Sequence, residues 1–495
     1  MRMNVGTVSR VALGAALVLA GPTLAIGDDS PLVEAVKRQD TSAVAALLRE
    51  NVDVNATLAD GGTALHWAAH LDDDGIVRRL IAAGATVDAA NEYGVTPLSL
   101  ACANGSATLV ELLLTAGADP NRTRPTGETP LMRAASTGSV AAVEALLKHG
   151  AEVNGTEPAY GQTPLMWAIS TGHYPVAELL VESGADVGAR STGGFTPLLF
   201  AAREGDLDSA RVLVNAGADV HDVMEDGTSA LVVATVRGHA PLAVFLLEHG
   251  ADPNAAEPGY TALHWVAGSW QTELSGPNGI ATRRDAEWRA LRGVPGDKIG
   301  LVEALLAHGA DPNARLERTP PRAGYSQLRV EHGVHGVSPF PGATPFLLAA
   351  MAGDVDVMRA LVDGGADPGL AADDRTTPLM LAAGLGRYLA ETLVTEARSL
   401  ESVSLALEFG ADVNAVNETG NTALHGAAWI KSDPLVRLLV DNGAALDPVN
   451  ARGQTPLMVA ELSRAGSATT TTRTSTGDLL RALGAESVPA NQPPR

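Results

Sequence analysis

The sequence predicts an all-α repeat solenoid, in which short helical repeats stack along one direction. The chain has 495 residues, of which 45% are hydrophobic but only 4% aromatic. Many small cores of alanine and leucine need few aromatic residues, and a stacked array accommodates this length without several globular domains. A Thr-Pro-Leu or Thr-Ala-Leu tripeptide recurs, mostly every 32–34 residues. In most repeats a glycine follows the start by 21 residues, as from Thr63 to Gly84, and two landmarks with one spacing indicate a repeat.

About twelve repeats share this pattern. Their first residues are Ser30, Thr63, Thr96, Thr129, Thr163, Thr196, Ser229, Thr261, Thr344, Thr377, Thr422 and Thr455.

The first segment of each repeat predicts a short helix. Thr or Ser can cap a helix, and proline suits the first helical position because its missing N–H is not needed there. Thr129-Pro130 and Thr455-Pro456 therefore predict helix starts. Leu131 is followed by Ala134 and Ala135 on one face, and such small residues let neighbouring helices approach closely.

The second segment predicts another helix with one apolar stripe. In the fourth repeat this stripe consists of Val140, Val143, Leu146 and Leu147. Gly150 predicts the end of that helix, and Asp119-Pro120-Asn121 predicts a turn in the preceding repeat. Each repeat is therefore expected to form helix, turn, helix and a hairpin-like loop.

These motifs resemble the ankyrin repeat, whose Thr-Pro-Leu-His-x-Ala hallmark is matched by Thr63–Ala68, Thr261–Val266 and Thr422–Ala427. Its closing hallmark stands intact at Gly410–Ala415. The resemblance covers about Ser30 to Ala485. At the histidine position, other repeats carry Ser99, Met132, Met166, Leu199, Val232, Met380 and Met458.

The three hallmark histidines, His66, His264 and His425, are expected to bond to neighbouring backbone rather than to share a metal. Trp67, Trp167 and Trp265 each follow the histidine position, which favours packing along the first helices with partial exposure.

The solenoid is expected to span residues 28–487, with polar capping repeats at its ends and a disordered tail at 488–495. Three insertions interrupt it, at about 268–298, 315–342 and 386–400. Insertions in a solenoid form loops on one surface, often the binding surface. The first two gather aromatic and cationic residues, which either contact a partner or cover the stack. The residues chosen there as partner contacts are Trp270, Arg283, Arg284, Trp288, Tyr325 and Arg329.

Residues 1–25 predict a cleavable signal peptide. Arg2 and Arg10 form a basic start, and an apolar run then leads to small residues suited to cleavage after Ala25 or after Gly27. The run is shorter than the roughly 20 residues that span a membrane, and no cysteine nearby offers a lipid anchor. The protein is therefore expected in the periplasm or secreted, without membrane insertion after signal removal.

Composition argues against several functions. The formal charge is −22, and it becomes −24 without the first 25 residues, which opposes nucleic-acid binding. Cys102 is the single cysteine, so no internal disulfide or multi-cysteine zinc site can form, and its place suits packing better than nucleophilic chemistry. We found no nucleophile elbow, phosphate-binding loop or HExxH motif, and we expect no cofactor and no enzymatic activity.

The favoured function is a monomeric protein–protein interaction scaffold. The ankyrin resemblance implies contacts on the hairpin tips and on the concave face, at positions after the helix Ala pair. The tip positions are Glu92, Tyr93, Arg124, Thr126, Tyr160, Thr192, Phe195 and Glu225. The helix positions are His70, Leu71, Asn104, Arg203, Glu204, Arg237 and Trp429.

Two alternatives stay open. One is an accessory or protective subunit of a periplasmic enzyme, docking through the insertions between residues 268 and 342. The other is a metal-binding or cryptic enzymatic site at His332 and His335, although no further ligand lies nearby in sequence.

Overall fold

The computed structural model of the chain describes residues 30–257, 259–268, 298–318, 341–386, 394–462 and 473–486. These residues contain 24 α-helices, and an isolated β-bridge joins Val223 and Ser229. The predicted all-α repeat solenoid is confirmed. The chain divides into two compact units, Met1–Asp222 (unit 1) and Val223–Arg495 (unit 2), each built from consecutive helix pairs.

The described part of unit 1 contains α1 (Pro31–Lys37), α2 (Thr41–Arg49), α3 (Ala64–His70), α4 (Asp74–Ala82), α5 (Pro97–Ala103), α6 (Ala107–Thr115), α7 (Pro130–Thr137), α8 (Val140–Lys148), α9 (Pro164–Ser170), α10 (Tyr174–Glu182), α11 (Pro197–Glu204) and α12 (Leu207–Asn215).

The described part of unit 2 contains α13 (Ala230–Arg237), α14 (Ala240–Glu248), α15 (Ala262–Ala267), α17 (Lys298–Ala307), α19 (Pro345–Ala352), α20 (Val355–Asp363), α21 (Pro378–Ala382), α22 (Glu396–Glu408), α23 (Ala423–Ile430), α24 (Asp433–Asp441), α25 (Pro456–Ala460) and α26 (Ser475–Ala482).

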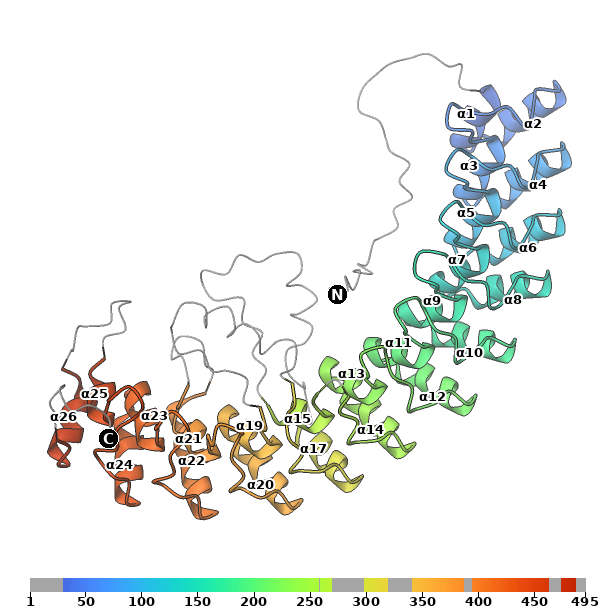
Figure 1. The fold of residues 1–495 in the computed structure, drawn as a ribbon. Helices are drawn as coiled ribbons and strands as arrows, with labels where there is room; N and C mark the ends of the chain where they lie inside the picture. The colour runs from blue at the N-terminus through green and yellow to red at the C-terminus, as the bar shows by residue number, and fades with distance from the viewer. Residues whose placement is uncertain are drawn as a thin grey trace. The chain divides into compact units, whose positions relative to one another are not determined.

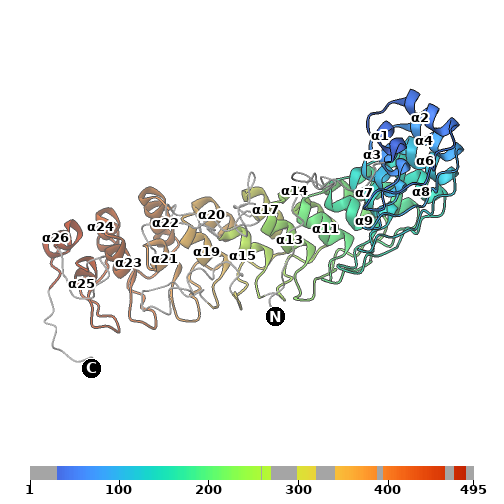
Figure 2. The same cartoon turned by 90° about the horizontal axis from the view of Figure 1, so that it is seen from above.

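The helices form two rows within each unit. In unit 1, the first helices of successive repeats pack side by side, as α7 packs on α9 (Figure 1). The second helices form another row beside them, in which α6 packs on α8. The view from above shows the same two rows in unit 2, with the hairpin loops projecting beyond the first helices (Figure 2).

The predicted caps start the first helices. Thr129 is extended, with φ −94° and ψ 159°, and its hydroxyl accepts a hydrogen bond from the Met132 N–H at 3.1 Å. Pro130 follows at the first helical position. The Thr455-Pro456 start is confirmed in the same way, because the Thr455 hydroxyl accepts from the Met458 N–H at 3.3 Å.

Most second helices end at glycines, as predicted for Gly150, whereas α2 is followed by Asn51 with φ 55°. Gly150 has φ 89°, in the left-handed region that favours glycine, and its N–H donates to the Leu147 carbonyl at 3.0 Å. The predicted stripe of α8 is partly wrong, since Val140 is 38% exposed while Val143 and Leu146 are fully buried. Val140 is the first residue of α8, and Leu147, the last residue of the predicted stripe, is half-buried.

The core of each repeat is small, as the composition predicted. Ala134 and Ala135 have no exposed surface, and Leu131 is 1% exposed. Cys102 takes the second alanine position in its repeat and is likewise fully buried. The first helices therefore approach closely at these small residues.

Closing-turn asparagines join neighbouring repeats. Asn121 Nδ2 donates to the Gly150 carbonyl at 2.9 Å, and its Oδ1 accepts from the Glu152 N–H at 2.8 Å. The same pair of bonds is made by Asn55, Asn154, Asn254, Asn313 and Asn414. Gly188 and Gly369 stand at the equivalent positions of two other repeats and have no side chain to make this link.

The insertion boundaries differ in detail from those predicted. Residues 396–400, assigned to the third insertion, form the first turn of α22, because Thr395 caps this helix by accepting from the Arg398 N–H at 3.3 Å. Lys298, the last residue of the first predicted insertion, begins α17. The two ends of the second predicted insertion, Arg315–Arg318 and Pro341-Gly342, belong to a hairpin. Its backbone pairs at Leu316, whose N–H donates to the Ala343 carbonyl at 2.9 Å and whose carbonyl accepts from the Gly342 N–H at 2.8 Å.

Candidate partner-binding surface

The hairpin tips of unit 1 are built on one local pattern. In each, the N–H of the first tip residue donates to the carbonyl that precedes the next Thr cap, as Asn91 does to Val95 and Arg124 to Glu128, both at 3.0 Å. Gly94 stands in the turn with φ 68°, a conformation that costs a side-chain-bearing residue energy. The tips are therefore tight turns rather than open loops.

Neighbouring tips also contact one another. The Glu92 N–H donates to the Asp60 carbonyl at 2.9 Å, and the Thr192 N–H donates to the Tyr160 carbonyl at 2.8 Å. Pro125 has no N–H to offer, and its ring packs so closely on Gly94 that a Cβ there would lie 2.3 Å from the proline Cδ. These contacts hold successive tips in fixed register.

Two tyrosines project from this row. Tyr93 is 64% exposed and Tyr160 is 59% exposed, so each presents a large amphipathic side chain to solvent. Glu92, Thr126 and Thr192 are exposed beside them. The predicted tip residue Glu225, in unit 2, is exposed as well.

Phe195 differs from the other predicted tip residues. It is only half-exposed, and its ring lies 5.5 Å from the ring of Phe200. Arg203 covers both rings, with its guanidinium carbon 4.6 Å from the Phe200 centroid, and it donates from Nε to Glu204 at 2.7 Å. Phe195, Arg203 and Glu204 thus form one packed cluster at the edge of the surface.

Among the predicted first-helix positions, some side chains hold the repeats together. Asn104 Nδ2 donates to the carbonyls of Ala69 at 3.0 Å and His70 at 3.1 Å, which satisfies the end of α3. His70 packs edge-on against Trp67, with ring centroids 5.9 Å apart. Leu71 is half-buried at the end of the same helix.

In unit 2, Arg237 and Trp429 are half-buried near the ends of α13 and α23. Eight further predicted residues lie outside the described part of the chain: Trp270, Arg283, Arg284, Trp288, Tyr325, Arg329, His332 and His335.

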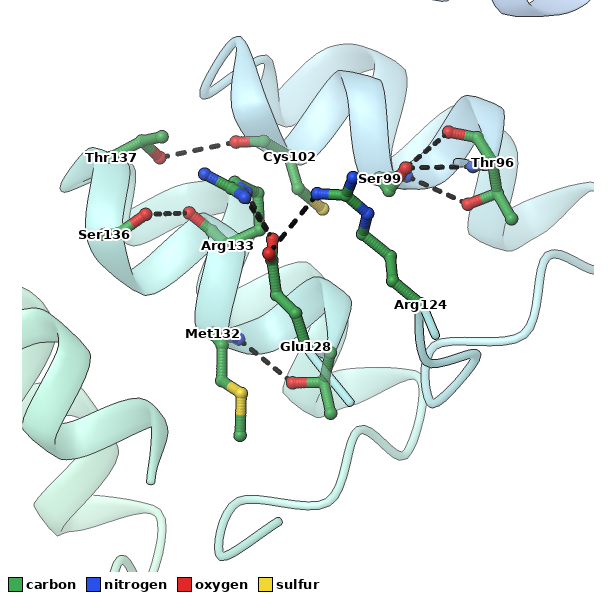
Figure 3. A network of polar contacts seen from close by, with 10 residues as sticks. Thr96, Ser99, Cys102, Arg124, Glu128, Met132, Arg133, Ser136 and Thr137 are labelled. Atoms are coloured by element: carbon green, nitrogen blue, oxygen red, sulfur yellow. Dashed lines mark hydrogen bonds and ion pairs between the residues drawn. The ribbon is translucent and has the colours of Figure 1, made fainter. Parts of the chain in front are cut away.

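The sequence pattern did not predict a buried ionic cluster that the structure shows in unit 1. Arg133 donates from Nε to Glu128 Oε1 at 2.5 Å, and Arg124 Nη1 lies 3.4 Å from Oε2 of the same carboxylate (Figure 3). The side chains of Arg133, Glu128 and Arg124 are 8%, 10% and 28% exposed. The available signal was an arginine at the position after the hallmark histidine, where other repeats carry Trp67, Trp167 or Phe200.

The hallmark histidines act as predicted, through backbone hydrogen bonds. His66 Nδ1 accepts from the Thr63 N–H at 3.1 Å, so Nε2 is the protonated nitrogen, and it donates to the Val95 carbonyl of the next hairpin at 2.9 Å. His264 and His425 repeat the arrangement. Burial lowers the pKa of His264 to about 4, and it lowers the pKa values of His66 and His425 in the same direction.

Where the histidine is replaced, the helix still forms. The Ser99 hydroxyl accepts from the Thr96 N–H at 2.9 Å but donates to the Thr96 carbonyl within its own repeat (Figure 3). The short side chain keeps the cap and loses the link to the next hairpin. Cys102, in the same helix as Ser99, is a buried free cysteine. Burial raises the pKa of its thiol far above the usual range, which favours a protonated sulfur that serves as a packing group.

The described residues hold neither a metal-binding cluster nor a membrane-spanning helix. Within the six described ranges, no group of three or more His, Cys, Asp or Glu side chains is placed to hold a metal ion. The helices in those same ranges also include none that is long and apolar enough to cross a bilayer.

Known proteins share this pattern. A family model described as "Ankyrin repeats (3 copies)" matches residues 32–124, 109–191, 198–274 and 393–469, and one described as "Ankyrin repeat" matches 342–375. A solved structure of the human ASB11 ankyrin repeat domain is 29% identical, with a TM-score of 0.41, and the match covers 45% of this chain and 99% of that chain.

Similar curated proteins include the E3 ubiquitin-protein ligase KEG of Arabidopsis thaliana, 30% identical over 31% of this chain and 8% of its own length. The human neurogenic locus notch homolog protein 1 is 36% identical over 24% of this chain and 4% of its own length. The mouse B-cell lymphoma 3 protein homolog is 46% identical over 14% of this chain and 15% of its own length. The matches thus span only small parts of these relatives.

The two family models together cover more than half of the chain, in the same register as the helix pairs, the Thr caps and the closing glycines. The chain belongs to the ankyrin repeat family, whose members are generally non-enzymatic scaffolds for protein–protein interaction.

Proposed function

We propose that this protein binds another protein through the hairpin tips and the first-helix row of unit 1. One observation carries the proposal: Tyr93 and Tyr160, 64% and 59% exposed, project from tips that are locked to their neighbours by backbone bonds and close packing. Tyrosine is enriched in binding hot spots, and it gives large contact area at a low cost in side-chain entropy.

The fixed register of the tips supports the same proposal. A surface that is already ordered before binding loses little conformational entropy when the partner arrives. The tips and first helices supply contacts along several repeats, which suits an extended partner segment.

Capture by the full chain tests this function. We expect the wild-type protein to retain a defined partner from the extract of its source cells, and the Tyr93→Ala/Tyr160→Ala double variant to lose it. Tyr174, which is 44% exposed at the start of second helix α10, supplies the matched control. Equal retention by the double variant, or equal loss with Tyr174→Ala, argues against the proposed surface.

We also propose that the protein acts outside the cytoplasm, in the periplasm or after secretion, as a monomer that binds no nucleic acid. The basic start, the apolar run and the small residues before Ala25 support export. Mass spectrometry of the protein recovered from its source should find a mature N-terminus at Ile26 or Asp28. Recovery of a cytoplasmic chain that retains residues 1–25 contradicts this part of the proposal.

A further inference from the structure

The cluster formed by Arg124, Glu128 and Arg133 holds two cations and one anion. Among the described residues, Glu128 is the one acid within ion-pair distance of either arginine. Arg133 has the short contacts, 2.5 Å from both Nε and Nη2 to Oε1, whereas Arg124 reaches Oε2 at 3.4 Å. The cluster therefore carries one formal positive charge in excess, in a setting where charges are poorly solvated.

Two hydrogen-bond donors in and beside this cluster also lack acceptors among the described residues. Arg124 Nε is buried, and no described residue accepts its hydrogen bond. Trp167 Nε1 is a second buried donor without a described acceptor. Its indole ring lies below Arg133, whose guanidinium carbon is 5.9 Å from the ring centroid. A buried donor that lacks an acceptor is costly, so the described residues leave this cluster with more hydrogen-bond donors than acceptors.

The geometry singles out Arg124 as the residue that meets an external acceptor. It comes from the hairpin tip, its side chain is 28% exposed, and Figure 3 shows it reaching toward Glu128 from the side opposite Arg133. Arg133 is 8% exposed and holds the carboxylate of Glu128 in place. The two terminal Nη groups of the Arg124 guanidinium form a pair of parallel donors, which matches the two oxygens of a carboxylate.

We propose that Arg124 binds an Asp or Glu side chain of the partner segment through its two terminal Nη groups. Arg124 then exchanges its long contact with Glu128 for the incoming carboxylate, and Arg133 positions Glu128 without touching the partner. This inference rests on the proposed function, because it assigns the chemistry of the segment that lies along unit 1. It makes an acidic residue the specific requirement for recognition by a protein with a formal charge of −22.

Selection of peptides on the full chain tests this. Phage-displayed random twelve-residue peptides are selected on the wild type, on Arg124→Gln and on Arg122→Gln, which removes an exposed arginine of the same hairpin. We expect Asp or Glu to be enriched at one position for the wild type and for Arg122→Gln, and this enrichment to vanish for Arg124→Gln. Arg124→Lys, which keeps the charge and loses the fork of donors, should bind the selected peptides with intermediate affinity.

Pairs of synthetic peptides then measure how much affinity the acidic residue contributes. A selected peptide and its Glu→Gln or Asp→Asn twin are compared by fluorescence polarisation, and the twin should bind the wild type about tenfold more weakly. Arg124→Gln should bind both equally, with its circular dichroism melt confirming that it is folded. Equal affinity of the twins for the wild type, an equal loss with Arg122→Gln, or a selection that yields no binding peptide each overturns the inference. Peptides without an acidic bias that still need Tyr93 and Tyr160 overturn it too, while leaving the proposed function standing.

Discussion

Asn121 and Gly150 join two repeats of unit 1. The Asn121 amide donates to the Gly150 carbonyl at 2.9 Å, and its oxygen accepts from the N–H of Glu152 at 2.8 Å. A single side chain thus satisfies a donor and an acceptor left over at the end of the next second helix. Because each repeat contacts mainly its neighbours, the strength of such links decides how well the array transmits order along the stack.

Asn121→Ala should lower the stability of unit 1 by about 1 kcal/mol, since it removes two hydrogen bonds near the surface. The urea unfolding midpoint should fall, and the amides of residues 150–152 should exchange faster with deuterium. Asn215→Ala is the control, because this exposed side chain makes no bond to another repeat in the described part of unit 1. An equal effect of the two substitutions contradicts the role given to Asn121.

Gly188→Asn should have the opposite effect. Gly188 is the position equivalent to Asn121 two repeats further on, it lacks the side chain for the link, and a Cβ there meets nothing closer than 3.5 Å. An asparagine should bond to the next repeat and raise the free energy of unfolding by up to about 1 kcal/mol, which the urea midpoint should report as an increase. No gain, together with unchanged exchange at residues 217–219, would show that this repeat junction is arranged differently.

Acid should weaken the fold through the hallmark histidines. The pKa of His264 falls to about 4 in the folded chain from a usual value of 6.5, so the neutral ring stabilises the fold above pH 6.5. That contribution is lost progressively as the pH falls from about 6.5 to about 4, and it amounts to about 3 kcal/mol.

His264→Met tests this dependence of stability on pH. Methionine stands at the same position of other repeats, as Met132 and Met166. The variant should be less stable at pH 7, because it loses the bonds to Ala314 and Ala343, but its urea midpoint should change less between pH 6.5 and 4. An identical acid dependence of the variant and the wild type would refute the assignment to His264.

Cys102 should not react with thiol reagents in the folded protein. Its side chain is fully buried, and burial raises its thiol pKa, so no thiolate is accessible near neutral pH. The thiol should react only after denaturation. Cys102→Ala/Ala103→Cys moves the thiol to the exposed neighbouring position and should react promptly without denaturant. Rapid labelling of the native wild type is the result that contradicts this packing.

Arg375→Gly should stabilise unit 2 by about 1 kcal/mol. Arg375 has φ 64° at a hairpin tip, where Gly94, Gly127 and Gly420 take the same conformation in other repeats. Glycine adopts this region without the steric cost that a side chain brings. Thermal melts of the full chain should show the gain, and Gly94→Arg should show a loss, because its Cβ meets the ring of Pro125. A lower melting temperature for Arg375→Gly contradicts this account.

The repeat fold could be predicted because its signals are local. Thr129 caps the helix that starts at Pro130, and Gly150 follows the end of α8. His66 bonds to the next hairpin. Each of these interactions lies within about one repeat of sequence. A pattern that recurs about twelve times adds these local preferences until they specify one architecture.

The Arg124 cluster could not be predicted in the same way. Arg133 occupies a position that holds Trp67 in another repeat, and its burial depends on Trp167 of the following repeat and on Glu128 of the hairpin before it. Such contacts are set by stacking rather than by the residues next in sequence. The exposure of Val140 is a similar case, because only the packed structure shows which end of the α8 stripe faces solvent.

Site-specific photo-crosslinking tests the binding surface most directly. A photoreactive phenylalanine analogue replaces Tyr93, Tyr160 or Tyr174 in separate full-length variants, and each is exposed to the partner retained in the capture experiment. We expect covalent adducts with that partner from positions 93 and 160 and none from position 174. Adducts from position 174 alone, or equal adducts from all three positions, would contradict binding by the hairpin tips of unit 1.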